Sequence, residues 1–204
     1  MRNEILSVAK NLFHKQGLEN TSIEEISKCA GYNAGELQRI YTSEYDLFFE
    51  VVTTDAAEFV AHLQNHVKGL PHISQQITTY LDKKNAYYLD VISRNKISKL
   101  TLNAILPQFF QIYEEIMNEE ITFLAQLLQA AIVKKQIEIV NTRQLAFSIL
   151  KINSAAMHHA ERGNLLSTNA PDYQNMRQAV DFMLQQVIKG LTCNHRIEKI
   201  AQLN

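Results

Sequence analysis

Residues that interrupt helices are scarce in this sequence. Its 204 residues include six Gly, three Pro and no Trp. So few helix breakers over such a length favour long helices joined by few connections. Cysteine is equally rare: Cys29 and Cys193 are too few for a disulfide framework and lack the spacing of metal ligands, so we interpret both as ordinary core or surface residues.

Long apolar runs are also missing. No stretch approaches the roughly 20 uncharged apolar residues that a membrane-spanning helix requires. Residues 1–5 lead directly into a helical pattern, without the apolar core of a signal peptide, so we expect a cytoplasmic protein. The net charge of −1 gives no sign of nucleic-acid binding. With 46% hydrophobic and 20% charged residues, the chain has an ordinary globular balance.

Hydrophobic periodicity predicts helices along the whole chain, and no segment alternates like a strand. A first helix should end at Gly17, and the segment from Thr21 to Glu25 is a capping box that starts a second, which Gly31 ends. A third short helix should start near Asn33 and run to about Tyr41. Longer helices are predicted over 47–66, from 72 into the low nineties, from a start or kink at Pro107 to about Lys135, over 142–162 and over 172–191. The predicted fold class is all-α.

Two capped helices joined by a Gly-containing turn within about 20 residues form a helix-turn-helix pattern, whose second helix can enter the DNA major groove. Over about the first 55 residues, the sequence resembles the TetR (tetracycline-repressor) family. The resemblance rests on Ile5-Leu6-x-x-Ala9-x-x-Leu12-Phe13-x-x-x-Gly17, on Thr21-Ser22-Ile23-x-x-Ile26 with Ala30-Gly31, and on Gly35, Leu37, Tyr41, Ser43, Asp46 and Leu47.

The resemblance implies an all-α homodimer of about nine helices, with a helix-turn-helix DNA-binding domain over 1–46. Residues 47–204 would form a ligand-binding and dimerisation domain, which 47–66 connect to the head. In this family the last two long helices pair with those of the partner in a four-helix bundle, and a ligand between the central helices changes the separation of the two reading heads. Two-fold symmetry implies a pseudo-palindromic operator.

The N-terminal head departs from the family pattern in its charge. The family usually has a Lys or Arg near the position of Ala34, an aromatic at that of Gln38 and a Lys at that of Glu44. Residues 1–50 hold five bases against eight acids, a net charge of −3. Because phosphate neutralisation supplies most non-specific DNA affinity, we expect weak binding with a shallow salt dependence. The alternative is a module of the same fold that binds a ligand or a protein and has lost most DNA affinity.

Candidate DNA contacts lie on the second and third helices and at the start of the fourth. The hydroxyls of Thr21 and Ser22 suit a phosphate, and Arg39 suits a phosphate or a guanine. Asn33 and Gln38 could pair with adenine and Glu36 with cytosine, although Asn33 and Glu36 fit a helix-capping pair equally well. Gly35 would let the backbone approach DNA or pack on a neighbouring helix, and Tyr41 suits the core better than a contact. The complete set is Thr21, Ser22, Asn33, Ala34, Gly35, Glu36, Gln38, Arg39, Tyr41 and Glu44.

Apolar side chains in the second domain supply two further candidate sites, and ordinary core packing explains each of these residues as well. A ligand pocket could be lined by aromatic, Met and His side chains: Tyr87, Tyr88, Phe109, Phe110, Tyr113, Met117, Met157 and His158. A dimer interface could use the apolar stripe of the last helix: Met176, Val180, Met183, Leu184, Val187 and Ile188.

Catalytic patterns are weak. His62 and His66 stand four residues apart with Glu58 one turn earlier, a spacing that can bind a metal, but a solvated helix face explains it better. The sequence has no His-Glu-x-x-His, phosphate-binding Gly loop or nucleophile elbow. We therefore predict no enzyme activity, no metal and no cofactor. The predicted partners are double-stranded operator DNA, an unidentified small-molecule effector and a second copy of the chain, with no membrane.

Overall fold

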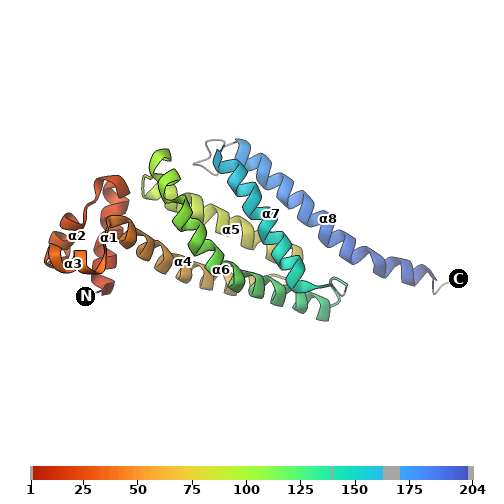
Figure 1. Cartoon of the computed structure of the whole chain (residues 1–204). Coiled ribbons are helices and arrows are strands. Elements are labelled where there is room, and N and C mark those ends of the chain that lie inside the picture. Colours follow the sequence, from red (N-terminus) through yellow and green to blue (C-terminus); the bar gives the residue numbers. More distant parts are fainter. Residues whose placement is uncertain (1, 139, 163–170, 202–204) are drawn as a thin grey trace. The chain divides into compact units, whose positions relative to one another are not determined.

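The fold is all-α, as the sequence predicts. The computed structural model describes residues 2–138, 140–162 and 171–201. These residues form eight α-helices and one short 3-10 helix, with no strand among them (Figure 1). The elements are α1 (Arg2–Gln16), η1 (Leu18–Asn20), α2 (Ile23–Ala30), α3 (Ala34–Ile40), α4 (Glu44–Lys68), α5 (Ile73–Arg94), α6 (Lys99–Val133), α7 (Thr142–Arg162) and α8 (Pro171–Ala201).

Of the two predictions for Pro107, a helix start or a kink, the start is wrong. Helix α6 begins at Lys99, and Pro107 lies inside it. The start is set by Ser98, whose Oγ accepts a hydrogen bond from the backbone N–H of Thr101 at 3.2 Å, because such an acceptor satisfies an N–H that the first helical turn leaves open. Proline removes one hydrogen bond of the helix. The roughly two turns between the Ser98 cap and Pro107 still form, and the helix continues beyond the proline.

The chain groups into two compact units. The first comprises residues 1–62 and 87–109, and the second 63–86 and 110–204. Helices α4, α5 and α6 contribute residues to both. The division into a DNA-binding domain over 1–46 and a helical domain over 47–204 concerns function rather than packing, and it stays a prediction.

The core of the first unit forms around Phe48. Its fully buried ring meets Phe13 of α1 edge-on, with the centroids 5.5 Å apart. The turn between α5 and α6 holds the end of α1, since Leu18 donates its backbone N–H to the Asn95 carbonyl at 3.0 Å. Gly17 stands there at φ 96°, and a Cβ would lie 3.1 Å from the Cβ of Lys96. The predicted end of the first helix at Gly17 is confirmed, with both its conformation and the close approach favouring glycine.

The core of the second unit combines apolar packing with buried polar pairs. Tyr80 is fully buried and donates its hydroxyl to Glu120 at 2.8 Å, while Lys84 Nζ lies 2.6 Å from the same carboxylate. Asn85 and Asn153 exchange two side-chain hydrogen bonds of 2.9 and 3.1 Å. Because buried polar groups cost free energy unless they are satisfied, these pairs fix α5 against α6 and α7 in one register.

The Asn85–Asn153 pair is testable by mutation. We expect Asn85→Ala to lower the free energy of unfolding by about 1–3 kcal/mol, since it leaves the buried Asn153 amide without its partner. The double variant with Asn153→Ala should lose less than the sum of the two single losses. Urea denaturation measures both, and Asn175→Ala at an exposed α8 position serves as the control. Additive losses would contradict the pairing.

The described helices include none that is long and apolar enough to cross a membrane. Within the same residues, no three His, Cys, Asp or Glu side chains are grouped to hold a metal ion. Glu58, His62 and His66 are all exposed on α4, as the interpretation of a solvated helix face requires.

Candidate nucleic-acid interface and ligand groove

Helices α2 and α3 form a compact helix-turn-helix. The Ser22 side chain caps α2 by accepting from the backbone N–H of Glu25 at 3.2 Å. Gly31 ends the helix at φ 74°, and Tyr32 donates its N–H back to the Ser27 carbonyl at 2.9 Å. This 6→1 bond at a left-handed glycine is the Schellman arrangement. Three residues, 31–33, therefore suffice to turn the chain from α2 into α3, as the sequence predicts.

Helix α3 presents one face to solvent. Asn33 caps it, with its Oδ1 accepting from the Gly35 N–H at 2.8 Å. Leu37 anchors the opposite face and is 1% exposed. Four of the predicted contact residues are exposed along α3, and Ala34 is half-buried. The four are Gly35, Glu36, Gln38 and Arg39.

The side chains on this face differ in whether they form hydrogen bonds or ion pairs within the protein. Gln38 donates one amide N–H to Glu24 of α2 at 2.8 Å, so one of its two amide donors is already used. Arg39 forms no hydrogen bond or ion pair with any residue that the structure describes. Among the bases of residues 1–50, Arg2 is paired with Glu50 and Lys10 with Asp55. Arg39 is thus the uncommitted cation of α3.

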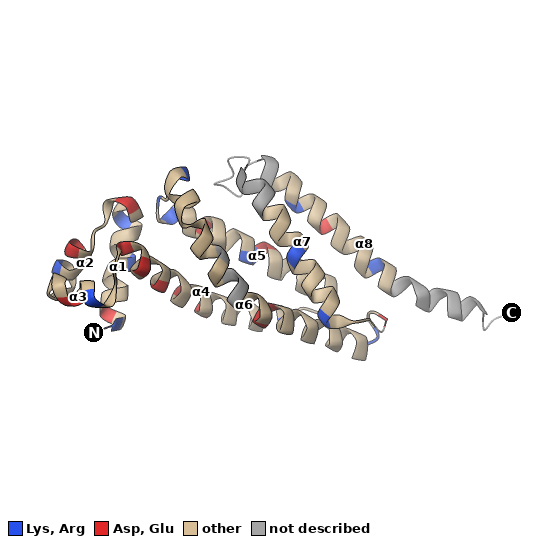
Figure 2. Cartoon of the chain, viewed as in Figure 1, with Lys and Arg blue, Asp and Glu red and all other residues tan. Residues whose placement is uncertain are grey.

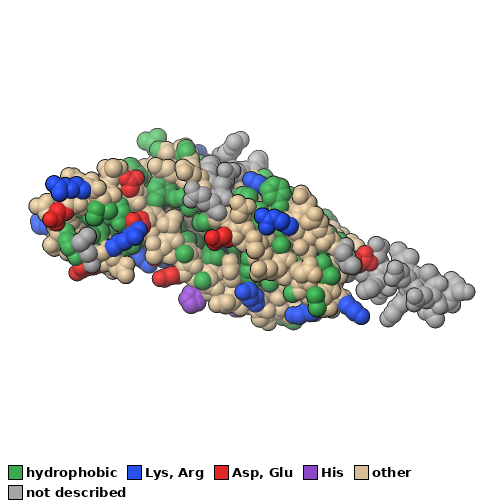
Figure 3. Space-filling view, turned by 60° about the horizontal axis from the view of Figure 1, so that its bottom comes forward, with side chains coloured by type: hydrophobic (Ala, Val, Ile, Leu, Met, Phe, Trp, Pro, Cys, Tyr) green, Lys and Arg blue, Asp and Glu red, His purple; other side chains and the backbone are tan. Residues whose placement is uncertain are grey.

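Acidic side chains of the head are largely structural acceptors. Acidic and basic residues are interspersed along α1 to α4 (Figure 2), and they also mix on the face of the N-terminal part drawn in Figure 3. The carboxylates of Glu36 and Glu44 form no hydrogen bond or ion pair within the described residues. The six others within residues 1–50 each accept a hydrogen bond: Glu4, Glu19, Glu24, Glu25, Asp46 and Glu50.

Two of the candidate DNA contacts lie in the interior. Thr21 is 4% exposed and donates its hydroxyl to the Gly17 carbonyl at 2.8 Å. Tyr41 is 5% exposed, and its hydroxyl donates to Glu50 at 2.9 Å. Burial, with help from that hydrogen bond, raises the pKa of Tyr41 to about 12. The structure therefore places both residues in the core of the head. This agrees with the preference of Tyr41 for the core, whereas the Thr21 hydroxyl, expected to meet a phosphate, is buried and bonded within the protein.

The start of α4 is a reciprocal cap. Ser43 Oγ accepts from the Asp46 N–H at 3.2 Å, and the Asp46 carboxylate accepts from the Ser43 N–H at 3.1 Å. The Thr42 hydroxyl also donates to Asp46 and is the main reason that the pKa of this carboxyl lies below its usual value. Glu44 is the first residue of α4, where a negative charge is favourable for the helix dipole but unfavourable for a nearby phosphate.

Removing either half of this cap should destabilise the protein. At neutral pH we expect Ser43→Ala and Asp46→Asn each to cost about 1 kcal/mol, the usual value of a helix cap. Because the folded-state pKa of Asp46 is lowered, its contribution is present above the ordinary value of 3.8 and is lost as the pH falls through the folded pKa. The gap between Asp46→Asn and the wild type should therefore shrink in acid. Urea midpoints from pH 7 to 3 test this, with Ser7→Ala on exposed α1 as the control.

The candidate ligand residues are divided between the two units. In the first unit, Tyr87 stacks on Phe59 with centroids 4.3 Å apart, and Tyr88 meets Phe109 edge-on at 6.1 Å. In the second unit, Met117 is 6% and Met157 is 7% exposed. The side chains of Phe110, Tyr113 and His158 lie outside the described residues.

A cavity of about 250 Å³ lies within the first unit beside the Phe59–Tyr87 stack. Its walls include the Lys10–Asp55 ion pair, whose charged atoms are 2.7 Å apart. His14 also faces it, and burial followed by the nearby Arg94 lowers the pKa of this imidazole. Acids and bases are balanced here, so the cavity has no marked preference for the charge of a ligand.

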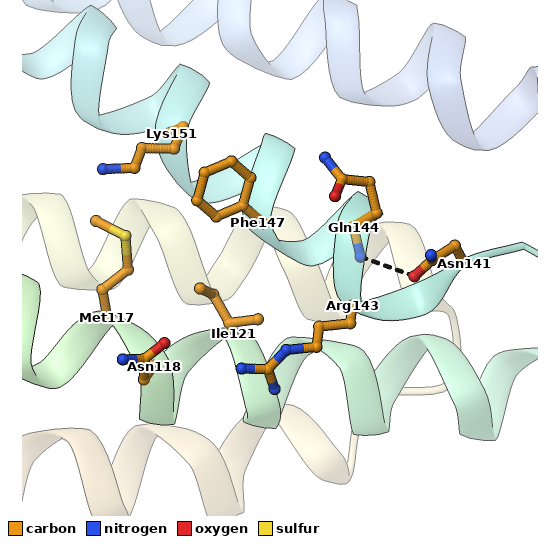
Figure 4. A pocket seen from close by; sticks show the side chains of 8 residues that line it. All are labelled: Met117, Asn118, Ile121, Asn141, Arg143, Gln144, Phe147 and Lys151. Carbon is orange, nitrogen blue, oxygen red and sulfur yellow. Dashed lines mark hydrogen bonds between the residues drawn. The ribbon is translucent and has the colours of Figure 1, made fainter.

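A larger groove of about 480 Å³ lies between α6 and α7 in the second unit (Figure 4). Met117, Asn118 and Ile121 of α6 form one side. The start of α7 forms the other, and Asn141 caps that helix by accepting from the Gln144 N–H at 3.0 Å. The remaining lining residues are Arg143, Phe147 and Lys151.

Sequence reasoning identified Met117 but missed the α7 side of the groove. Arg143, Phe147 and Lys151 recur at intervals of four residues, which places them on one helix face. That spacing is a visible signal, but it does not reveal which neighbour the face meets. In the sequence alone, a Phe with a cation four residues before and after it is indistinguishable from an ordinary solvent-exposed helix face.

The apolar residues of α8 that form the candidate dimer interface are partly buried within the protomer and partly exposed. Val180, Leu184 and Ile188 are between 1% and 8% exposed and belong to the core of the protomer. Val187 is 37% exposed, and Met176 and Met183 are half-buried. Phe182, which the candidate interface omitted, is 65% exposed.

Similarity to known proteins agrees with the helix-turn-helix geometry. Residues 5–51 match the family model described as bacterial regulatory proteins, tetR family. These residues belong to the TetR family. An HTH-type transcriptional regulator of Staphylococcus aureus (strain USA300) is 33% identical over 63 residues, which are 31% of this chain and 34% of that protein. The match thus spans about a third of that relative's length. A second such regulator, from strain bovine RF122, is 23% identical over 128 residues, 58% of this chain and 68% of that protein.

Solved structures extend the likeness over most of the chain at the level of fold. A transcriptional regulator from Cytophaga hutchinsonii has a TM-score of 0.74 at 17% identity, covering 92% of this chain and 96% of that one. A TetR/AcrR-family regulator from Thermobifida fusca has a TM-score of 0.58 at 16% identity, covering 90% and 95%. The chain therefore has the fold of TetR-family transcriptional regulators.

Proposed function

We propose that this protein is a TetR-like transcriptional regulator that binds operator DNA as a homodimer under the control of a small-molecule ligand. The observation that carries the proposal is the capped α2–turn–α3 unit within the segment that matches the family. Leu37 holds α3 in place, so that its exposed face, with Arg39 uncommitted, is free to meet the edges of bases.

Short-range contacts dominate the proposed DNA interface. The capped start of α2 at Ser22 offers backbone N–H groups to a phosphate. Arg39 suits a guanine edge or a phosphate, and Glu36 can accept from cytosine. Because Arg2 and Lys10 are engaged in ion pairs, few cations remain for counterion release, and the salt dependence should be shallow.

Titration of the protein's own upstream DNA from about 50 to 200 mM salt tests the proposal. Arg39→Ala should weaken sequence-selective binding by about tenfold or more, as expected for one lost base or phosphate contact. Glu44→Lys should strengthen binding and steepen the salt slope by about one phosphate contact. Lys134→Gln, an exposed charge change in the second unit, should leave binding unaltered.

The second candidate function is a ligand-binding or interaction module of the same fold without general DNA affinity. The net charge of −3 over residues 1–50 and the uncompensated Glu44 favour it. The same titration decides between the two. If the wild type does not bind DNA at the lowest salt and Glu44→Lys restores binding, charge loss is the cause. If neither the wild type nor Glu44→Lys binds, the proposal of a DNA-binding regulator is refuted.

The proposed homodimer would use exposed apolar side chains of the last two helices. Ile152 of α7 is 42% exposed, and Phe182 and Val187 of α8 are 65% and 37% exposed. Leu184 and Ile188, on the other side of α8 from Phe182, are already buried in the protomer. A second copy would remove these exposed groups from water, and their burial supplies the main driving force for association.

Sedimentation of the purified protein tests this surface. We expect a dimer that Phe182→Glu converts to a monomer, because a buried unpaired carboxylate opposes association. Leu100→Glu is the matched control: Leu100 is 81% exposed and belongs to α6 rather than to the proposed surface on α7 and α8, and this variant should remain dimeric. A wild-type monomer at concentrations that bind operator would contradict the proposed dimer.

A further inference from the structure

The groove between α6 and α7 has an unbalanced charge. Arg143 and Lys151 both line it, and none of its eight lining residues is acidic. Asn118, Asn141 and Gln144 supply the neutral polar groups. In the close-up view, the side chains of Arg143 and Lys151 lie on either side of Phe147 (Figure 4). Two cations with no carboxylate among the described lining residues favour a negatively charged occupant.

The floor of the groove is apolar. Met117 and Ile121 of α6 are 6% and 5% exposed, and Phe147 of α7 is 39% exposed. Lys151 Nζ lies 5.8 Å from the centroid of the Phe147 ring, so the ring and the cation form one continuous surface. An occupant that covered this floor would bury the Phe147 ring, which the protomer itself leaves exposed.

We propose that this groove binds a small amphipathic anion, an alkyl or aryl carboxylate whose apolar part covers Met117, Ile121 and Phe147. Arg143 receives the carboxylate, because the planar guanidinium can donate two parallel hydrogen bonds to its two oxygens. Lys151 adds a second positive charge, and the amides orient the head group. The inference rests on the proposed function in one respect, since it names the class of effector.

The dimensions of the groove suit such a ligand. Its volume of about 480 Å³ lies within the usual range for pockets that hold small molecules. A medium-chain carboxylate is small enough to fit. Asn141 already caps α7 through the Gln144 N–H, so charge recognition rests on the Arg143 and Lys151 side chains rather than on the end of the helix.

Calorimetric titration of the full-length protein with three probes of the same chain length tests the inference: decanoate, decyltrimethylammonium and decanol. The two ionic probes are kept below their micelle concentrations and decanol below its solubility limit. We expect decanoate to bind at least about tenfold more tightly than the other two, the usual effect of a charge-assisted hydrogen bond. Equal binding of the three probes would overturn charge selection, and no binding of decanoate would overturn the site.

Variants locate the binding within the groove. Arg143→Gln and Lys151→Gln should each weaken decanoate binding by about tenfold, whereas Lys134→Gln removes a charge outside the lining and should not. Phe147→Ala should weaken decanoate and decanol alike. Undiminished binding by Arg143→Gln and Lys151→Gln would place the ligand elsewhere and refute the proposal.

This experiment and the DNA titration fail independently. Decanoate binding is measured without DNA, so a protein that binds decanoate but no operator would keep the groove and lose the regulator. A protein that binds operator but not decanoate would support the regulator and refute the anion site in the groove. Where both bind, decanoate should change operator affinity in the wild type and not in Arg143→Gln.

Discussion

The packing of Phe48 is the interaction on which the first unit depends. Its ring is fully buried between Phe13 of α1 and Phe109 of α6, with centroid distances of 5.5 and 6.4 Å and both contacts close to edge-on. Edge-to-face geometry adds to the gain from burial. One side chain thus joins the helix that begins the head, the connecting helix that carries it and a helix more than fifty residues further along the chain. Helix α1 also packs against α2, and α2 packs against α3. The orientation of α2 and α3 therefore depends on the packing of α1 on Phe48.

Carboxylates in the head act mainly within the fold. Asp46 caps α4, and Glu19 accepts the Ser98 backbone N–H at 2.9 Å and so ties η1 to the start of α6. A carboxylate accepts several hydrogen bonds at once, which makes it an effective acceptor for the open N–H groups at helix starts. An acidic head is therefore compatible with a well-fixed helix-turn-helix. The cost falls on long-range attraction to DNA, because an internally bonded carboxylate still carries its charge.

Local signals account for what the sequence predicts well. Gly17 and Gly31 end α1 and α2 at positive φ, and Ser22 and Asn33 cap the starts of α2 and α3, all through contacts within five residues. The candidate pocket stays a prediction, because grouping its residues needs tertiary information. Tyr87 belongs to the first unit, while Asn85, two residues earlier on the same helix, is buried in the second. Helical periodicity assigns a face to each residue, but it does not say which partner that face meets along a helix shared by two units.

Helix α6 contributes residues to both units, and this bears on how the proposed effector could act. Helix α6 carries Phe109, which packs in the first unit, and Met117 and Ile121, which line the groove of the second. A ligand in the groove can alter DNA binding only if its affinity differs between two arrangements of the protein, and operator DNA must then change ligand affinity by the same factor. Helix α6 runs without a break from Phe109 to Met117, so in the proposed regulator such coupling would pass along this one element.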